Sequence, residues 1–336
     1  MNDLLNKLLI LRTPKIGPAK YAALLKQYGC DGAIIESLNL TDDFKDSVKR
    51  EMDMAYELGI EYIVDTDSRY PIGLLNVKNH PIVISARGNL NTLQKKSVSI
   101  VGTRHSTATG MNFVSDLATA FVEHGFVVAS GMAMGTDTAA HIGALKADGN
   151  NQTIAVLAGG VDNIWPLENE SLYYEIMERG VLISEMPVGT NPVASNFIQR
   201  NHWVAAISDF LIISEADMKS GSMTTARFAK EYGKQVFAVP GHPSDPRSSG
   251  PNYLIKSGDA TLCMSINDFF DDKNIKTDEK KHTYKNDILD KLGMIPVSES
   301  VLANLVKKTV SEIKADLVVL ELQGLIRKQD GGYVLN

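Results

Sequence analysis

The sequence has little of what marks a secreted, membrane-bound or metal-dependent protein. Its two cysteines, Cys30 and Cys263, lie outside any C-x-x-C motif or His/Cys cluster, so neither a disulfide framework nor a zinc site is expected. We predict that both are buried as small apolar side chains. No apolar run reaches the roughly eighteen residues of a membrane span, and the first residues lack the cationic segment, apolar stretch and cleavage site that are typical of a signal peptide. This pattern predicts a cytoplasmic protein without membrane contact.

Positive charge is also scarce. The chain has 34 Lys and Arg against 40 Asp and Glu, a net charge of −6. None of the segments 1–94, 95–263 and 264–336 is basic overall. This balance argues against a broad basic surface that coats nucleic acid, but it leaves room for a small pocket built from a few Arg side chains and backbone amides.

Motifs for catalysis and cofactor binding are missing as well. The sequence has no G-x-G-x-x-G fingerprint and no Walker lysine, and it offers no Ser/His/Asp order, paired carboxylates or metal-ligand set. We therefore expect no cofactor, no metal and no catalytic residue, and we predict that the protein is not an enzyme.

What the chain does have is a long alternation of strand and helix patterns from Val98 to Cys263. Its apolar runs are rich in Val and Ile and bounded by small or polar residues, as in strands covered on both faces. The fold class predicted is α/β, an extended Rossmann-like, doubly wound sheet. The predicted strands are V-S-I-V-G, V-V-A-S, T-I-A-V-L-A, V-L-I-S-E, F-L-I-I-S and Q-V-F-A-V.

Helical patterns come before this region. One helix is predicted to end near Thr13, a turn follows at Ile16 and Gly17, and a second helix starts at Pro18, which suits a first helical position. This outline is that of a helix-hairpin-helix in a small N-terminal (SAM-like) helical domain. Its turn amides would contact DNA phosphates, or the hairpin is only a packing element; both interpretations stay open.

After the α/β region, the charged residues 271–286 are typical of a linker. Three short helical patterns and a hairpin follow, with Gly324 stopping the last helix and Asp330 opening the hairpin turn, which predicts a winged helix. The predicted domains are 1–93 for the N-terminal helical domain and lead-in, 94–270 for the Rossmann-like domain, 271–286 for the linker and 287–336 for the winged helix.

Two Gly/Ser-rich turns stand out within the α/β region. S-G-M-A-M-G-T-D covers Ser130 to Asp137, and S-G-S-M-T-T covers Ser220 to Thr225; each follows an apolar run and opens a helical pattern. The first amides of such a helix are unpaired and carry the positive end of its dipole, so each turn is a candidate phosphate cradle. Together they would hold one nucleotide or successive phosphates of a strand. The candidate residues are Ser130, Gly131, Gly135, Asp137, Ser220, Gly221, Ser222 and Thr224.

Further candidates lie at neighbouring strand ends and helix starts. Gly102, Thr103 and Arg104 end the first strand, where a guanidinium suits a phosphate, and Arg200 with Asn201 opens a helix. A surface Arg paired with a carboxylate, or a solvated first turn, would explain the same residues.

Two more interpretations stay open in this region. Trp165 would stack on a base or only pack its loop. Asp137 and His141 share a helical face as an acid/base pair, or serve as a helix cap and a packed side chain.

Taken in order, S-I-V-G-T-R, S-G-M-A-M-G-T-D-T-A-A-H, L-I-S-E-M-P-V-G-T, F-I-Q-R-N, S-G-S-M-T-T-A and F-A-V-P-G-H resemble the signature of the DNA-processing protein A family (DprA, also called Smf). The resemblance covers nearly the whole chain. It implies a non-catalytic homodimer that binds and protects single-stranded DNA and helps to load the RecA recombinase during natural transformation, DNA uptake and recombination. Carried over, the DNA-binding residues are Arg104, the Gly131 to Asp137 turn, Arg200, Asn201 and the Ser220 to Thr224 turn.

Two residues depart from the family pattern. His202 stands where relatives commonly have Arg, and Met134 stands where many carry Lys or Arg. Each change removes a possible phosphate contact, which predicts lower and less salt-dependent affinity. The first turn would then hold phosphate by amides alone, leaving Arg104 and Arg200 with more of the charge.

An enzyme of a related class is the alternative. Phosphoribohydrolases of the lysine-decarboxylase-like group resemble this chain in strand order and Gly-rich turns, but they use P-G-G-x-G-T-x-x-E with a catalytic Glu that is absent here.

For the winged helix, duplex DNA binding competes with partner contact or packing. The candidate recognition helix, Val310 to Leu322, sets Lys314 against three acidic residues, which disfavours duplex readout.

Overall fold

The computed structural model describes residues 2–150, 152–273, 288–293, 296–322, 325–329 and 331–335. The chain divides into two compact units, Met1–Asn274 and Ile275–Asn336, which we call the body and the C-terminal unit.

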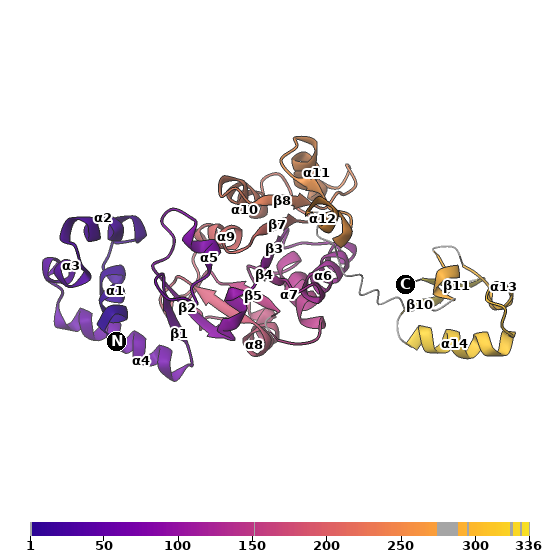
Figure 1. Ribbon diagram of the computed structural model, residues 1–336, viewed down its shortest axis with the longest axis horizontal. Coiled ribbons are helices and arrows are strands. Elements are labelled where there is room, and N and C mark those ends of the chain that lie inside the picture. Colours follow the sequence, from indigo (N-terminus) through magenta and orange to yellow (C-terminus); the bar gives the residue numbers. More distant parts are fainter. Residues whose placement is uncertain are drawn as a thin grey trace. The chain divides into compact units, whose positions relative to one another are not determined.

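Within the described residues, the body contains a nine-stranded sheet in the order β1-β2-β6-β5-β4-β3-β7-β8-β9 (Figure 1). β2 runs antiparallel to β1 and β6, and the neighbouring pairs from β6 to β9 are parallel. The predicted doubly wound α/β class is confirmed. The six predicted strands are β3 to β8, while β1, β2 and β9 extend both edges without having been predicted. The strands are β1 (Glu61–Val64), β2 (Val83–Gly88), β3 (Ser97–Val101), β4 (Val127–Ser130), β5 (Thr153–Val156), β6 (Val181–Ser184), β7 (Phe210–Ile213), β8 (Gln235–Ala238) and β9 (Thr261–Leu262).

Helices cover both faces of this sheet. One face packs against α5, α9, α10 and α11, and the other packs against α6, α7, α8 and α12. Successive residues of β3 divide between the two cores: Val98 and Ile100 face α6 and α7, and Val101 faces α9. This two-sided burial explains the unbroken apolar runs. The helices are α5 (Ile72–Leu75), α6 (Ala108–Glu123), α7 (Thr136–Lys146), α8 (Glu170–Arg179), α9 (Ala194–Ile207), α10 (Gly221–Glu231), α11 (Ser249–Lys256) and α12 (Ile266–Lys273).

The order of the strands places a crevice beside β3. The chain winds from β3 outward through β4, β5 and β6, then returns to place β7 on the other side of β3. Loops that leave the carboxyl ends of β3 and β7 therefore diverge, and ligands of doubly wound sheets bind at this switch point.

Four helices precede the sheet: α1 (Asn2–Arg12), α2 (Pro18–Tyr28), α3 (Asp31–Leu38) and α4 (Asp42–Glu57). α2 begins at Pro18, as predicted. Leu8, Ile10 and Ile34 lie at the centre of their own core, which also reaches Ile82 and Val83 at the start of β2.

A polar contact also fixes these helices to β1. Arg12 of α1 donates to the Glu51 carboxylate of α4 at 2.7 Å, and the Tyr62 hydroxyl of β1 donates to the same oxygen at 2.7 Å. Burial opposes ionisation of Glu51, but the hydrogen bonds from Arg12 and Tyr62 keep the pKa of this carboxyl below its usual value.

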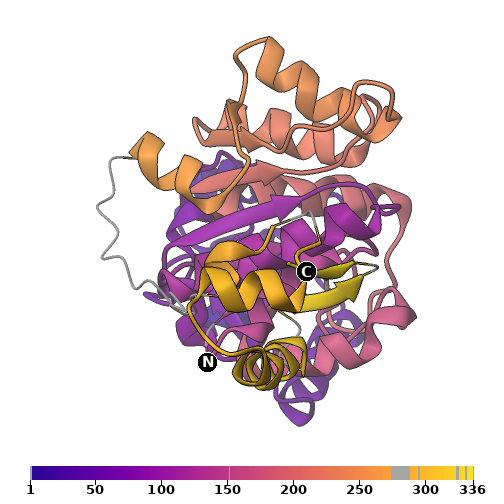
Figure 2. The same ribbon diagram turned by 90° about the vertical axis from the view of Figure 1, so that its right-hand side faces the viewer.

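The C-terminal unit contains a short 3-10 turn (Leu289–Lys291), α13 (Glu299–Leu305), α14 (Val310–Leu322) and the antiparallel pair β10 (Ile326–Gln329) and β11 (Gly332–Leu335). Figure 2 looks along α14 and shows the hairpin beside it. This arrangement confirms the predicted winged helix. The predicted stop residue Gly324, the turn residue Asp330 and the linker residues 274–286 lie outside the described residues, whereas residues 271–273 belong to α12.

Cysteine burial was predicted only in part. Cys263 is buried, but Cys30 is exposed at the N-cap of α3, so the prediction for Cys30 was wrong. A short helix in a four-helix cluster leaves its cap at the surface. In the part of the chain that the structure describes, we find no group of three His, Cys, Asp or Glu side chains placed to hold a metal ion. None of the described helices is long and apolar enough to cross a membrane.

Candidate nucleic-acid interface

A cavity of about 350 Å³ lies at the switch point of the sheet. Four segments line it: the loop after β3, the turn between β4 and α7, one side of α9 and the start of α10. The two Gly/Ser turns therefore meet at one cavity. Its lining residues are Val101, Gly102, Thr103, Arg104, His105, Gly131, Ala133, Asp137, Phe197, Ile198, Arg200, Asn201, Val204, Ser220, Gly221, Ser222 and Thr225.

The loop after β3 is held in place by Glu215, which follows β7. The Glu215 carboxylate accepts from the backbone amide of Thr107 at 2.8 Å and from its hydroxyl at 2.6 Å. The Thr103 amide donates to the Glu215 carbonyl at 2.6 Å. These bonds tie the loops of two adjacent strands together and fix the backbone that carries Arg104. Sequence reasoning missed Glu215.

Arg104 lies exposed at the mouth of the cavity against two aromatic rings. Its guanidinium carbon is 5.3 Å from the ring centroid of Trp165 and 5.3 Å from that of Phe197. The two rings meet edge to face with centroids 4.5 Å apart. No carboxylate among the described residues forms an ion pair with Arg104, so its charge can meet a phosphate. Of the two interpretations of Trp165, packing against Phe197 is observed, yet 36% of the residue remains exposed.

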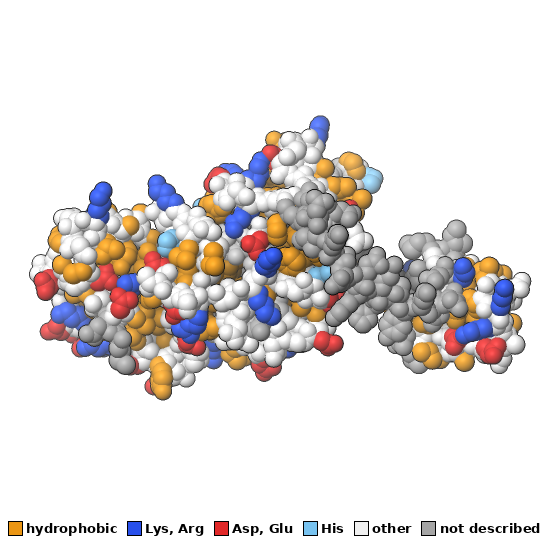
Figure 3. All heavy atoms as spheres, in the orientation of Figure 1, with side chains coloured by type: hydrophobic (Ala, Val, Ile, Leu, Met, Phe, Trp, Pro, Cys, Tyr) orange, Lys and Arg blue, Asp and Glu red, His pale blue; other side chains and the backbone are white. Residues whose placement is uncertain are grey.

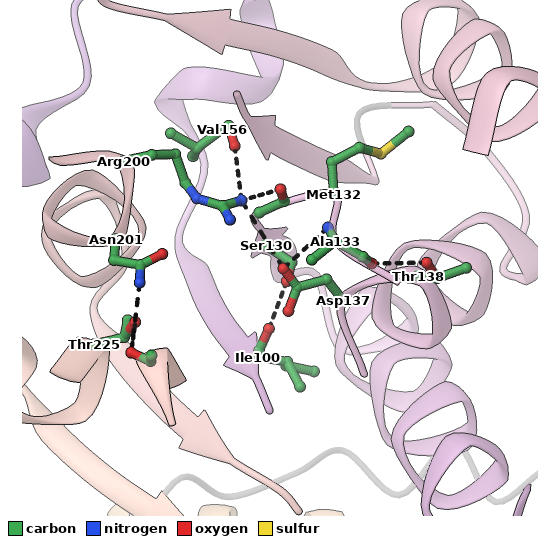
Figure 4. Close-up of polar contacts among 12 residues, drawn as sticks. Ile100, Ser130, Met132, Ala133, Asp137, Thr138, Val156, Arg200, Asn201 and Thr225 are labelled. Atoms are coloured by element: carbon green, nitrogen blue, oxygen red, sulfur yellow. Dashed lines mark hydrogen bonds and ion pairs between the residues drawn. The ribbon is translucent and has the colours of Figure 1, made fainter. Parts of the chain in front are cut away.

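Two side chains, Asp137 of α7 and Arg200 of α9, close the first Gly/Ser turn (Figure 4). Asp137, in the first turn of α7, accepts a hydrogen bond from the Ala133 amide at 3.2 Å. Arg200 reaches in from α9, donates to the carbonyl oxygens of Gly131 and Val156, and lies 3.9 Å from the Asp137 carboxylate. The Ala133 amide is therefore engaged by Asp137 and is not free to hold a phosphate, so the predicted cradle of free amides does not include Ala133.

Arg200 differs from its predicted role in the same way. Only 5% of its side chain is exposed, and its partner Asp137 is also buried. Burial raises the pKa of Asp137, although the Arg200 charge and the Ala133 amide oppose that change. Burial likewise lowers the pKa of Arg200. A guanidinium so placed is part of the cavity wall, and its main contacts are internal.

Both glycines of the first turn serve this packing. A Cβ on Gly131 would overlap the Arg200 guanidinium. Gly135 has a φ of 78°, and a Cβ there would meet the backbone of Thr103 and Arg104. Both glycines therefore allow a close approach to their backbone, and the approaching groups belong to the protein.

The second Gly/Ser turn is open. Ser220 caps α10 by accepting from the Met223 amide at 3.4 Å, and its hydroxyl lies 3.0 Å from that of Ser222. The first amides of α10, at Gly221 and Ser222, have no carbonyl partner within the helix and lie at the cavity lining. Asn201 of α9 donates to the Gly221 carbonyl at 3.4 Å and steadies the turn. This geometry is that of an anion site.

Most predicted site residues line this one cavity, and three do not. Ser130 is wholly buried, and its hydroxyl donates to the Ile100 carbonyl at 2.7 Å. Gly135 lies behind the loop, and Thr225 lines the cavity where Thr224 was predicted. The predicted residues found in the lining are Gly102, Thr103, Arg104, Gly131, Asp137, Arg200, Asn201, Ser220, Gly221 and Ser222.

Other lining residues were missed. Phe197 and Ile198 appear above only as part of the motif F-I-Q-R-N. Apolar side chains near the start of α9 could have predicted them, because a helix that starts at a crevice exposes its first side chains to it. His105 gave no signal.

His141 and His202 take no part in the lining. His141 is fully buried, its Nδ1 lies 2.6 Å from the Thr153 hydroxyl, and burial lowers its pKa to about 3. This geometry contradicts the acid/base interpretation of Asp137 and His141. His202 stacks on Phe228 with centroids 3.4 Å apart, and its Nδ1 lies 2.6 Å from the Tyr232 hydroxyl.

The sequence also matches known protein families and relatives. Residues 61–274 match the family described as DNA recombination-mediator protein A, and residues 282–332 match the DprA winged helix domain. The DNA processing protein DprA of Bacillus subtilis is 34% identical over 276 residues, covering 81% of this chain and 92% of that protein. The protein Smf of Escherichia coli is 32% identical over 294 residues, covering 81% and 77%.

Two solved structures are similar as well. The crystal structure of DNA processing protein A from Streptococcus pneumoniae has a TM-score of 0.70 and 28% identity, covering 80% of this chain and 97% of that one. DNA processing protein A from Helicobacter pylori, whose structure concerns a single-stranded DNA binding mode, has a TM-score of 0.58 and 31% identity, covering 64% and 96%.

Proposed function

Because the chain belongs to the family of DNA recombination-mediator protein A, we propose that it binds single-stranded DNA in the cavity beside β3 and acts without chemical turnover. The relative from Helicobacter pylori, described by its single-stranded DNA binding mode, supports this ligand.

One observation carries the proposal. The exposed Arg104 guanidinium forms no ion pair with a carboxylate of the described residues, and it faces the cavity that the start of α10 also lines. Arg104 and the first amides of α10 offer two kinds of anion contact at one cavity. A phosphate held by such groups leaves its base free to meet the rings of Trp165 and Phe197, which the same guanidinium contacts. Aromatic stacking tolerates any base, so we expect little sequence preference.

The distribution of surface charge supports DNA binding at one local site rather than over a broad basic surface. On the face shown in Figure 3, Lys and Arg side chains lie scattered among Asp and Glu. Affinity then depends on few phosphate contacts, and its dependence on salt should be shallow.

The experiment replaces Arg104 with Ala and uses Arg227→Ala as the matched control. Arg227 lies on α10 outside the cavity lining, with 66% of its side chain exposed. We expect Arg104→Ala to weaken binding of a single-stranded oligonucleotide about tenfold for every sequence and to lower the salt slope by about one. Arg227→Ala should bind as the parent protein does. Equal binding by Arg104→Ala and the parent would refute the assignment.

Trp165 offers a second readout. The chain has two tryptophans, and Trp203 is buried with 5% of its surface exposed, so a ligand at the cavity mouth acts mainly on Trp165. Oligothymidine should quench the tryptophan fluorescence of the parent, and the quenching should disappear in Trp165→Phe. Quenching that survives this substitution would place the bases elsewhere.

The wider role follows from family membership and stays a proposal. We propose that a homodimer protects single-stranded DNA in the cytoplasm and helps to load RecA onto it, as required in natural transformation. Adding the protein to DNA coated with single-strand binding protein should shorten the lag before RecA assembles. If the lag does not change while the protein still binds DNA, the proposed loading of RecA is refuted and the proposed DNA binding is not.

The phosphoribohydrolase alternative finds no support in the lining. Asp137 is the one carboxylate among the lining residues described for the cavity, and it is buried beside Arg200. Release of free base from nucleoside monophosphates would revive this alternative.

A further inference from the structure

The helix α14 of the C-terminal unit is apolar on its outer face as well as on its inner face. Ile313, Leu317 and Leu320 are at most 2% exposed and pack against the rest of the unit. On the opposite side, Val318 and Val319 are 53% and 52% exposed. A surface helix ordinarily turns polar side chains outward, so this outer face indicates a partner.

The outer face has the wrong chemistry for reading DNA. Ala315 and Ser311 lie about one and two turns before Val318 and Val319, and both are exposed. These four residues, which we call the outer face of α14, include no charge. Base and phosphate contacts need polar or cationic side chains, so the face suits an apolar protein surface.

Charges border the outer face on both sides, and the two borders differ. On one border, Glu312 accepts from the Thr309 amide at 2.9 Å and Asp316 accepts from Lys308 at 2.7 Å. These carboxylates are already engaged within the unit.

The other border carries Lys314 and Glu321, two helical turns apart. Lys314 lies 3.5 Å from Glu299 with 61% of its side chain exposed. Within the described residues, Glu321 forms no ion pair. This border therefore presents one cation and one anion, on either side of Val318.

We propose that the winged-helix units of two chains pair through the outer faces of α14, antiparallel about a two-fold axis beside Val318. In a two-fold antiparallel pair, a border of one helix faces the same border of its partner. Lys314 then lies opposite the partner's Glu321, and Glu321 opposite the partner's Lys314. A parallel pair would instead set Lys314 against Glu312 and Asp316 and leave Glu321 without a cation opposite it.

The pairing is weak between free chains, because one helix face is smaller than a stable interface requires. Two chains held together elsewhere, or bound to one DNA strand, raise the effective concentration of one α14 near another. The inference does not depend on the DNA-binding proposal, since the residues concerned lie in a different unit.

The test uses disulfide formation in the full chain. Cys30 is exposed and is first replaced by Ser, while Cys263 is buried. In this background, Val318→Cys places a thiol beside the proposed axis, and Lys328→Cys places one on β10, where 63% of the side chain is exposed. We expect Val318→Cys to form cross-linked dimers at least tenfold faster than Lys328→Cys in a glutathione buffer. Equal rates would indicate random collision and overturn the pairing.

Charge reversal gives a second, independent outcome. Lys314→Glu should slow cross-linking of Val318→Cys severalfold, and adding Glu321→Lys should restore it. Failure of either change to alter the rate would refute the antiparallel register. Protection of the Val318→Cys thiol from maleimide by duplex DNA, with no cross-linking, would assign the face to DNA and overturn the proposal.

Discussion

The two Gly/Ser turns look alike in sequence and differ in structure. Both follow a buried strand, open a helix and line the same cavity. In the first turn, the Asp137 carboxylate and the Arg200 guanidinium bind the backbone from within. In the second turn, a serine caps the helix and leaves the first amides facing the cavity. Small residues before a helix thus allow other groups to approach the backbone closely. Where a charged side chain of the protein lies nearby, that side chain binds the backbone; where none does, the backbone amides remain available to a ligand.

The largest expected effect separates the turns by adding one methyl group. Gly135→Ala should destabilise the protein by about 3 kcal/mol or more, because a φ of 78° is strained for alanine and the new Cβ would meet the backbone of Thr103 and Arg104. In Gly221→Ala the nearest atom is the Asn201 amide nitrogen at 3.4 Å, so stability should change by less than about 1 kcal/mol. Urea unfolding measures both, and equal losses would contradict the distinction.

The next effect concerns the charge inside the closed turn. Asp137→Asn leaves the buried Arg200 without its counter-charge and should cost about 3 kcal/mol of unfolding free energy. Replacing Asp217, whose carboxylate lies at the surface beside the open turn, by Asn should cost less than about 1 kcal/mol. A small loss for Asp137→Asn would mean that the pair does not hold the first turn.

A pH experiment tests α9, the helix that touches both turns. Burial raises the pKa of Glu185 to about 7, and this residue lies beside Gln199 and Trp203 of α9. A raised carboxyl pKa favours the folded state while the group is protonated, so stability is lost as the pH rises from the unfolded pKa through 7. Unfolding free energy should fall by about 2 kcal/mol between pH 5 and pH 8.

Glu185→Gln should remove most of this fall in stability, since the amide stays neutral. Glu178→Gln, at an exposed position of α8, should retain it. The same slope in all three proteins would place the titrating group elsewhere.

The smallest effect tests the open turn. Ser220→Ala removes the cap of α10 and should cost about 1 kcal/mol of stability. It should also weaken single-strand binding a few fold, because the amides at Gly221 and Ser222 become less ordered. Ser298→Ala removes the equivalent cap of α13 and should leave binding unchanged. Unchanged binding by Ser220→Ala would argue that the open turn does not face the DNA.

Sequence patterns predicted the fold better than the contacts of the site. Strands β3 to β8 were predicted because burial on both faces leaves an unbroken apolar run. β1 and β2 were not predicted, and the antiparallel pairing of β2 with β1 and with β6 depends on distant residues. The winged helix was predicted because its turns and helical periodicity are local.

The positions of the site residues were predictable, but their partners were not. Arg200 was expected to face the ligand; it is buried because Asp137 lies 3.9 Å away, 63 positions earlier in the chain. The choice between Thr224 and Thr225 depends on the face that α10 turns to the cavity, which its own sequence does not specify. The contact of Trp165 with Phe197 joins two loops, and no periodicity encodes such a pair.

Adjacent residues of α9 reach the two turns, Arg200 to the first and Asn201 to the second. A helix rises only about 1.5 Å per residue and resists stretching, so the turns are joined by a short, stiff spacer. The distance between the two turns is then fixed before any ligand binds. A ligand that contacts both turns must adapt its own conformation to that distance. A rigid binding site of this kind favours a flexible polymer, which can bend to fit it, over a rigid polymer, which cannot.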